Sequence, residues 1–86
     1  MKASEILPDE QNTTKINGIT IRKGSVGAFL ANWRVLQDAS RANEHASAKA
    51  DLLELLPALK ELGLFEVLTP RDPLLAQWLI DHNITP

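Results

Sequence analysis

The sequence contains no cysteine, and it lacks the long apolar runs of membrane and exported proteins. Without cysteine, disulfides, thiolate chemistry and the usual structural zinc ligands are excluded together. A membrane-spanning helix needs roughly 20 apolar residues, and the leucine-rich stretch of this chain is interrupted by Glu54, Pro57 and Lys60. The first residues hold no apolar run of signal-peptide length either. We therefore expect a soluble, cytoplasmic protein that does not contact a membrane.

Positive charge is also scarce for a protein that binds nucleic acid. The net charge is −2, and it is divided unevenly along the chain. Residues 1–43 carry six Lys or Arg against four acids, whereas residues 44–86 carry three against seven, which gives +2 and −4. Affinity for nucleic acid comes largely from phosphate contacts made by a concentrated basic face. This balance argues against nucleic acid as the partner.

Length and composition indicate one folded domain. A chain of 86 residues can build one core but not two, and contents of 44% hydrophobic and 23% charged residues are typical of globular proteins. Residues 1–12 are mostly polar and are predicted to form a flexible or loosely docked tail. Residues 13–86 are then the compact domain, and a partner or a second copy would add to its thin stability margin.

A β-hairpin is the clearest local signal in the sequence. Asn17-Gly18 suits the positive φ angles of a type I′ turn and lies between two short β-forming runs. In the second run Ile19 and Ile21 alternate with polar residues, so we expect the isoleucines to share a buried face. A lone hairpin is marginal in water, so it must pack on the rest of the domain.

A helix is predicted to follow the hairpin. Gly24 ends the strand, and Ser25 is placed to cap the helix. Apolar side chains recur along this segment at helical spacing, and they are Val26, Phe29, Leu30, Trp33 and Leu36. On the outer face Arg34, Asp38 and Arg41 are spaced so that the acid lies between the two bases.

Residues 37–51 contain no large apolar side chain, no glycine and no proline, and they allow two interpretations. Either the first helix stops near Ser40 and Asn43 caps a second helix, or one helix roughly 50 Å long runs from about Ser25 to Leu56. A continuous helix would align a narrow stripe with near-heptad spacing, made of Ala39, Ala42, Ala46 and Leu53. We favour the break, because so long a rod would overhang so small a domain.

The leucine-rich stretch that follows is predicted to hold the centre of the core. Its apolar residues are dense enough to require burial on more than one side, and they are Leu52, Leu53, Leu55, Leu56, Leu59 and Leu62. Pro57 should kink this helix or begin a short new one, which should end at Gly63.

The remaining residues predict a short strand and a last helix. Residues 65–68 are a candidate third strand beside the hairpin. Asp72-Pro73 then supplies a helix cap followed by proline at the first helical position, and the helix should end near Asn83. The expected fold is mainly α in the α+β class, with an N-terminal β-hairpin followed by a three-helix core.

The nearest approach to a ligand-binding loop is the turn after the hairpin. The N–H groups at a helix N-terminus attract anions, and a lysine there adds positive charge. The candidate anion-site residues are Lys23, Gly24, Ser25 and Gly27. The turn lacks the longer glycine spacing and the adjacent Lys-Ser/Thr pair of a P-loop, so a plain turn and cap explains the same residues.

No arrangement of residues indicates catalysis. The histidines, His45 and His82, each have only a neighbouring acid, and adjacent residues on a helix point about 100° apart, so neither pair can converge on one ion. The serines lie in no nucleophile motif. We therefore predict no catalytic residue, no metal site and no cofactor, and we do not expect an enzyme.

An interaction role is the remaining hypothesis. Trp33 and Trp78 are interpreted as core residues, with partial exposure at a partner-binding groove as the alternative. Surplus leucine offers a homodimer interface. The leading hypothesis is a small protein-interaction module that binds a protein partner or itself, with interface candidates Ala39, Ala42, Ala46, Leu53 and Leu56. The alternative is weak binding of nucleic acid or a phosphate ligand through the Lys23 glycine turn and nearby basic residues, namely Lys15, Arg22, Arg34 and Arg41.

Overall fold

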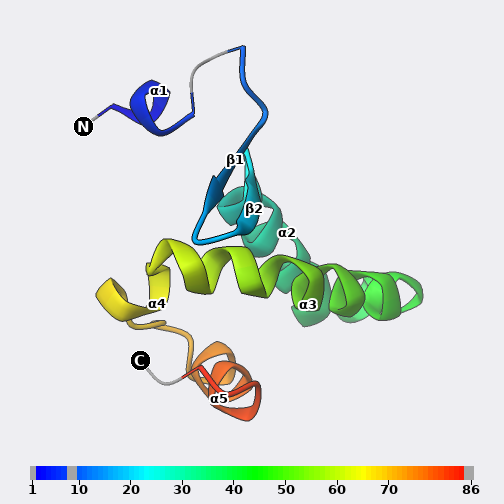
Figure 1. The fold of residues 1–86 in the computed structure, drawn as a ribbon. Coiled ribbons are helices and arrows are strands. Elements are labelled where there is room, and N and C mark those ends of the chain that lie inside the picture. The colour runs from blue at the N-terminus through cyan, green and yellow to red at the C-terminus, as the bar shows by residue number, and fades with distance from the viewer. Residues whose placement is uncertain (1, 8–9, 85–86) are drawn as a thin grey trace.

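The computed structural model describes residues 2–7 and 10–84, and it has the predicted class, mainly helical with an N-terminal hairpin (Figure 1). The elements in chain order are α1 (Ala3–Ile6), β1 (Thr13–Ile16), β2 (Ile19–Arg22), α2 (Ser25–Gln37), the 3-10 helix η1 (Ala39–Glu44), α3 (His45–Leu62), α4 (Leu64–Val67) and α5 (Pro73–Asp81). In Figure 1, α3 runs across the middle, with the hairpin on one side and α5 on the other. The single helical turn α1 lies within the segment predicted to be a tail.

The hairpin forms as predicted. Asn17 and Gly18 have φ angles of 52° and 81°, and the strands pair antiparallel with Ile16 opposite Ile19. Ile21 is buried and Ile19 is partly buried, so the isoleucines do share the inner face. The turn is also tied to α3, because the Asn17 side-chain amide donates a hydrogen bond to the Glu61 carboxylate.

Helix α2 begins where expected, but Ser25 does not cap it. Gly24 occupies the cap position with φ 85°, and the Ser25 hydroxyl instead donates a 2.6 Å hydrogen bond to the Arg22 carbonyl. Phe29 and Trp33 are buried on this helix as predicted. Two members of the predicted apolar stripe, Val26 and Leu30, are 39% and 49% exposed. The stripe is therefore wider than the surface that the neighbouring elements cover.

The chain breaks between α2 and α3, which confirms the favoured interpretation over the long rod. Asp38 is extended, and its carboxylate accepts hydrogen bonds from the Ser40 backbone N–H and hydroxyl. Glu44 precedes α3, so the prediction that Asn43 caps this helix is wrong. Arg41 pairs with Glu44 at 2.7 Å.

Helix α3 runs through Pro57 without interruption, so the alternative of a new helix there is wrong. Pro57 lies on the exposed face, where water can satisfy the carbonyl that lacks a proline N–H. The helix ends at Gly63 as predicted, with φ 78° and its N–H bonded to the carbonyls of Leu59 and Lys60. The core centres on α3, as expected, and its buried cluster comprises Phe29, Trp33, Leu52, Leu56, Leu59, Phe65, Leu75, Leu79 and Ile84.

The predicted third strand is wrong. Residues 65–68 overlap the helical turn α4, and within the described residues the sheet has two strands. Phe65 is buried, with its ring centroid 6.0 Å from that of Phe29. A helical turn after Gly63 directs this ring into the core, and the Leu68 N–H closes the turn on the Leu64 carbonyl at 2.9 Å. Packing of one large side chain thus decides the local conformation.

Helix α5 has the predicted start and end. The Asp72 carboxylate accepts a 2.9 Å hydrogen bond from the Leu74 N–H, and Pro73 opens the helix. Asn83 follows the last turn with φ 64°. Among the described residues, no helix combines the length and apolar character that crossing a membrane requires.

Candidate functional site

The predicted interface residues do not form one stripe. Ala39 and Ala42 lie on η1, whereas Ala46 lies on α3 beyond the break, and all three are exposed. Leu53 is 42% exposed, but Leu56 is 8% exposed and belongs to the core cluster. The break in the chain therefore separates the alanines, and Leu56 has little surface to offer a partner.

The predicted anion-site residues do lie together at the start of α2. Gly24 and Gly27 are exposed, as is Lys23, whose backbone N–H donates to the Asn12 carbonyl at 2.8 Å. Ser25 is 6% exposed, and its hydroxyl proton is used in the bond to the Arg22 carbonyl. A cavity of about 440 Å³ borders this turn. The turn can offer backbone groups and positive charge to a ligand, but not the Ser25 proton.

Beside this turn is a larger hollow of about 480 Å³, which we call the apolar groove. It lies where α1, β2, the start of α2 and the end of α3 meet, and its lining is mainly apolar. The lining residues are Ser4, Leu7, Ile21, Arg22, Lys23, Gly24, Ser25, Val26, Gly27 and Leu62. Arg22 and Lys23 are exposed along it and make up what we call the basic rim.

The apolar walls of this groove are only partly covered. Val26 on α2 is 39% exposed and Leu62 on α3 is 38% exposed, whereas Ile21 is fully buried at its base. Gly24 and Gly27 border open space, because a Cβ atom added at either would meet nothing within 4 Å. Helical spacing placed Val26 on the apolar face of its helix, and Leu62 belongs to the leucine-rich stretch that was predicted to hold the core, with a homodimer interface as a further use of its surplus leucines. The missed signal is the width of the α2 stripe, which exceeds one packing face.

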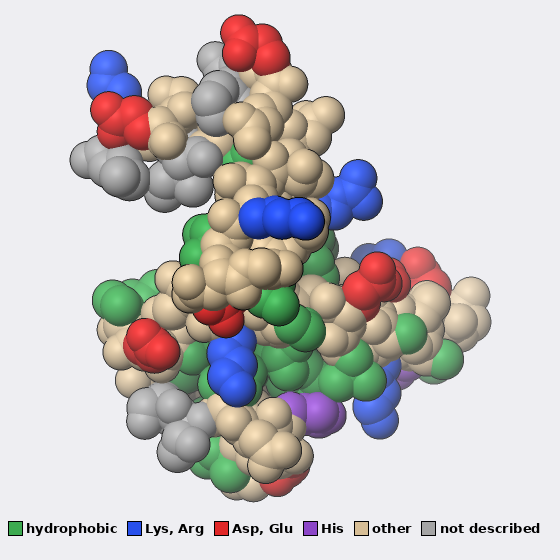
Figure 2. Space-filling view, viewed as in Figure 1, with side chains coloured by type: hydrophobic (Ala, Val, Ile, Leu, Met, Phe, Trp, Pro, Cys, Tyr) green, Lys and Arg blue, Asp and Glu red, His purple; other side chains and the backbone are tan. Residues whose placement is uncertain are grey.

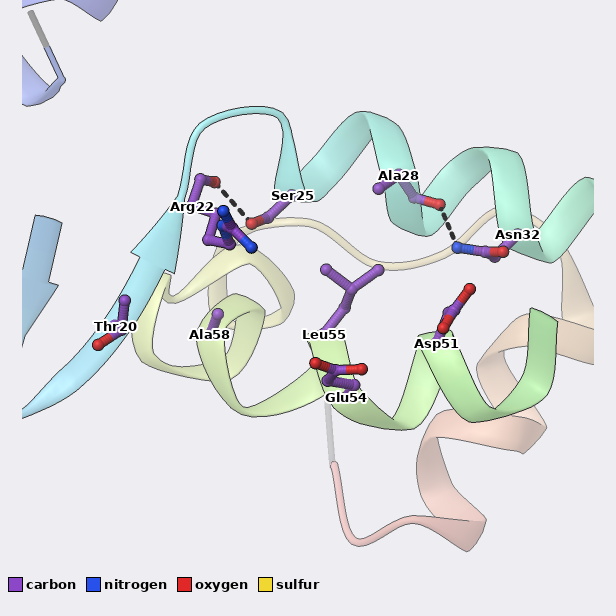
Figure 3. A pocket seen from close by; sticks show the side chains of 9 residues that line it. All are labelled: Thr20, Arg22, Ser25, Ala28, Asn32, Asp51, Glu54, Leu55 and Ala58. Atoms are coloured by element: carbon purple, nitrogen blue, oxygen red, sulfur yellow. Dashed lines mark hydrogen bonds between the residues drawn. The ribbon is translucent and has the colours of Figure 1, made fainter. Parts of the chain in front are cut away.

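A third hollow, of about 400 Å³, lies between α2 and α3, and charged, polar and apolar side chains all line it (Figure 3). Arg22 lines it, as do Asp51 and Glu54 on α3, and Leu55 lies between Arg22 and Asp51 in Figure 3. Within the described part of the chain, no ion pair joins Arg22 to either acid. The opposite charges are therefore held apart across an apolar side chain.

The two histidines are both bonded to backbone carbonyls. The His82 Nδ1 atom lies 2.7 Å from the Trp78 carbonyl oxygen, and His45 Nε2 lies 2.9 Å from the Asp38 carbonyl oxygen. Because a carbonyl can only accept, each of these nitrogens carries a proton. His82 also stacks on Trp78 with ring centroids 4.2 Å apart. Across residues 2–7 and 10–84, no group of three or more His, Cys, Asp or Glu could hold a metal ion.

Both tryptophans pack in the core, as predicted. Trp33 is 9% exposed, and Trp78 is partly buried against the core cluster. The Trp33 Nε1–H donates a 3.0 Å hydrogen bond to Asp72, and this bond lowers the pKa of the Asp72 carboxyl, with the Leu74 N–H adding to the effect. The carboxylate thereby connects α2 to the start of α5.

Comparison with known proteins adds no family: no protein-family model, curated protein or solved structure matches this chain. The chemistry of its own surface is therefore the basis for assigning a function.

Proposed function

We propose that this protein is a protein-interaction module that holds an apolar, acidic segment of a partner protein in the apolar groove. The observation that carries the proposal is the combination of half-exposed apolar walls at Val26 and Leu62 with the basic rim of Arg22 and Lys23. The leading hypothesis from the sequence was also an interaction module. That hypothesis placed the contact surface on the second helix and the alanine-rich segment before it, whereas the present proposal places it at the groove.

The two parts of the surface have different roles. Burial of apolar side chains supplies about 25 cal/mol for each Å² removed from water, so Val26 and Leu62 would supply affinity. Exposed charges at the edge of an interface add little energy, but they select partners and steer their approach. Arg22 and Lys23 would therefore favour a partner whose apolar side chains stand beside acidic ones.

Selection from a displayed library of random peptides tests this proposal without a known partner. We expect the protein to enrich peptides that combine an apolar pair with flanking acids. The variant Val26→Glu should lose this binding, because it places a charge in the apolar wall. The double variant Arg22→Glu and Lys23→Glu should shift the preference toward basic flanks.

A matched control is available on α3. Lys49 is exposed and lies near the start of that helix, far from Leu62 at its end. The variant Lys49→Glu changes the net charge in the same direction and should leave the selected peptides unchanged. Selection of the same peptides by Val26→Glu, or no enrichment by any form, would contradict the proposal.

The alternative proposal is weak binding of nucleic acid or a phosphate ligand through the Lys23 glycine turn. It is supported by the cavity of about 440 Å³ that borders the turn, with Arg22 and Lys23 in its lining. Such binding should weaken steeply as salt rises, because it depends on phosphate contacts. Titration of a labelled oligonucleotide and of inorganic phosphate at two salt concentrations would measure it. Equal affinity for the variant with both Arg22→Ala and Lys23→Ala would exclude this turn as the site.

A further inference from the structure

We infer that the segment held in the apolar groove is α4 of a second copy of this chain, so that two copies form a symmetric dimer with each α4 in the groove of the other. This inference rests on the proposed function, since it names the partner of the same surface. It also gives a specific form to the self-association that the sequence suggested.

The segment around α4 has the chemistry that the groove should select. Val67 is 83% exposed and the next residue, Leu68, is 58% exposed, and the preceding residue, Glu66, is exposed and acidic. In Figure 2, hydrophobic and acidic side chains lie side by side on the left of the view, where Figure 1 places α4. Phe65 is buried and Leu64 packs against the core cluster, so these two side chains hold the turn while Glu66 and Val67 face water.

The groove and α4 are also neighbours within one chain, which favours a closed dimer. Leu62, in the groove wall, is the last residue of α3, and only Gly63 separates it from α4. A surface that carries both an apolar projection and a matching groove can pair with itself about a two-fold axis. Each copy then places its α4 in the groove of the other, so the same contact forms twice. A doubled contact comes closer than one insertion to the area of roughly 800 Å² per partner that stable interfaces bury.

Charge supports the same arrangement. The groove rim belongs to the half of the chain with a charge of +2, and α4 belongs to the half with −4. Lys and Arg side chains lie over the hairpin in Figure 2. In a two-fold dimer, Arg22 of each copy approaches Glu66 of the other, so both contacts pair opposite signs.

Sedimentation equilibrium over a wide range of concentrations tests the dimer directly. We expect the wild-type chain to associate to dimers and not to larger chains. Val67→Glu on the projection and Val26→Glu in the groove should each weaken the dimer about tenfold or more, since each introduces a charge at the centre of the contact. Ile80→Glu is the control, because Ile80 is 49% exposed on α5, outside both surfaces, and it should leave the association unchanged. Circular dichroism of every variant verifies the fold.

A charge exchange sharpens the test. Arg22→Glu alone and Glu66→Arg alone should each weaken the dimer, because like charges then meet at both contacts. An equimolar mixture of the two variants should recover the mass of a dimer, since both contacts then pair opposite signs. A merely structural role for either residue would not produce recovery on mixing.

The outcomes separate this inference from the proposed function. A wild-type chain that stays monomeric at all concentrations, or a dimer insensitive to Val67→Glu, overturns the inference. If the groove still selects acidic apolar peptides in either case, the proposed function stands and its partner is another protein. If association occurs but Val26→Glu does not change it, the groove is not the dimer contact, and the inference fails.

Discussion

The two sides of α3 differ in how completely the neighbouring elements cover its apolar surface. On the side facing α5, buried aromatic rings pack together and Trp33 donates a hydrogen bond to the carboxylate that caps α5. On the side facing the hairpin, Val26 and Leu62 stay half-exposed around an open groove. Stability thus depends mainly on the first side, which leaves the second available for contact. A domain this small cannot cover all of its apolar surface with its own chain.

The largest effect should come from the buried core on the side of α3 that faces α5. Leu52 is 0% exposed in the core, so Leu52→Ala should lower the free energy of unfolding by about 2–5 kcal/mol through lost burial and a residual cavity. Urea denaturation at equilibrium measures this change. The next residue, Leu53, is 42% exposed and provides the control. If Leu53→Ala cost as much as Leu52→Ala, the contrast between covered and open surfaces would be wrong.

A smaller effect is expected at the turn that connects the two sides. Gly63 has φ 78°, a conformation that costs an L-residue roughly 1–2 kcal/mol. Gly63→Ala should lower the free energy of unfolding by about this amount. Gly27 lies inside α2 without a positive φ and has open space around its Cα, so Gly27→Ala should raise stability by about 0.4–1 kcal/mol. Thermal melts of the two variants should therefore shift in opposite directions.

The side that faces α5 should also respond to acid. Hydrogen bonds from Trp33 and Leu74 hold the pKa of Asp72 below its ordinary value of 3.8. The stabilisation from this carboxylate is therefore complete above pH 3.8 and is lost as the pH falls through the lowered folded-state pKa. Asp72→Asn should be less stable than wild type at neutral pH, and the gap should narrow in acid. A gap that stayed constant as the pH fell would show that the charge on Asp72 is not what stabilises the cap.

Features decided by neighbouring residues could be predicted from the sequence. Asn17-Gly18 determines the hairpin turn, Gly63 ends α3, and Asp72-Pro73 begins α5, each through backbone angles or hydrogen bonds within a few residues. The break after α2 was predicted from the size of the domain and not from its caps. The prediction that a break exists was therefore right, whereas the prediction of its capping residue was wrong.

Features that depend on distant contacts could not be predicted. The segment around Phe65 looked like a strand, but the packing of its ring on Phe29 from another helix makes it a helical turn. The apolar groove depends on the fold, which brings Leu62 at the end of α3 and Val26 at the start of α2 into the lining of one hollow. The sequence placed both residues at apolar positions of predicted helices. It could not show that the fold leaves their side chains partly exposed.

The smallest effect on stability should come from the open side, at Val26. Val26→Ala removes two methyl groups that are already partly in water, and alanine is the better helix former, so we expect the free energy of unfolding to change by no more than about 0.5 kcal/mol. The same variant should weaken binding of the selected acidic peptides, because those methyl groups would be buried only in the complex. Urea denaturation and fluorescence anisotropy of a labelled peptide would measure the two quantities on one sample. A large loss of stability with unchanged peptide binding would show that Val26 stabilises the fold and does not bind the peptide. The proposed difference between the two sides of α3 would then be wrong.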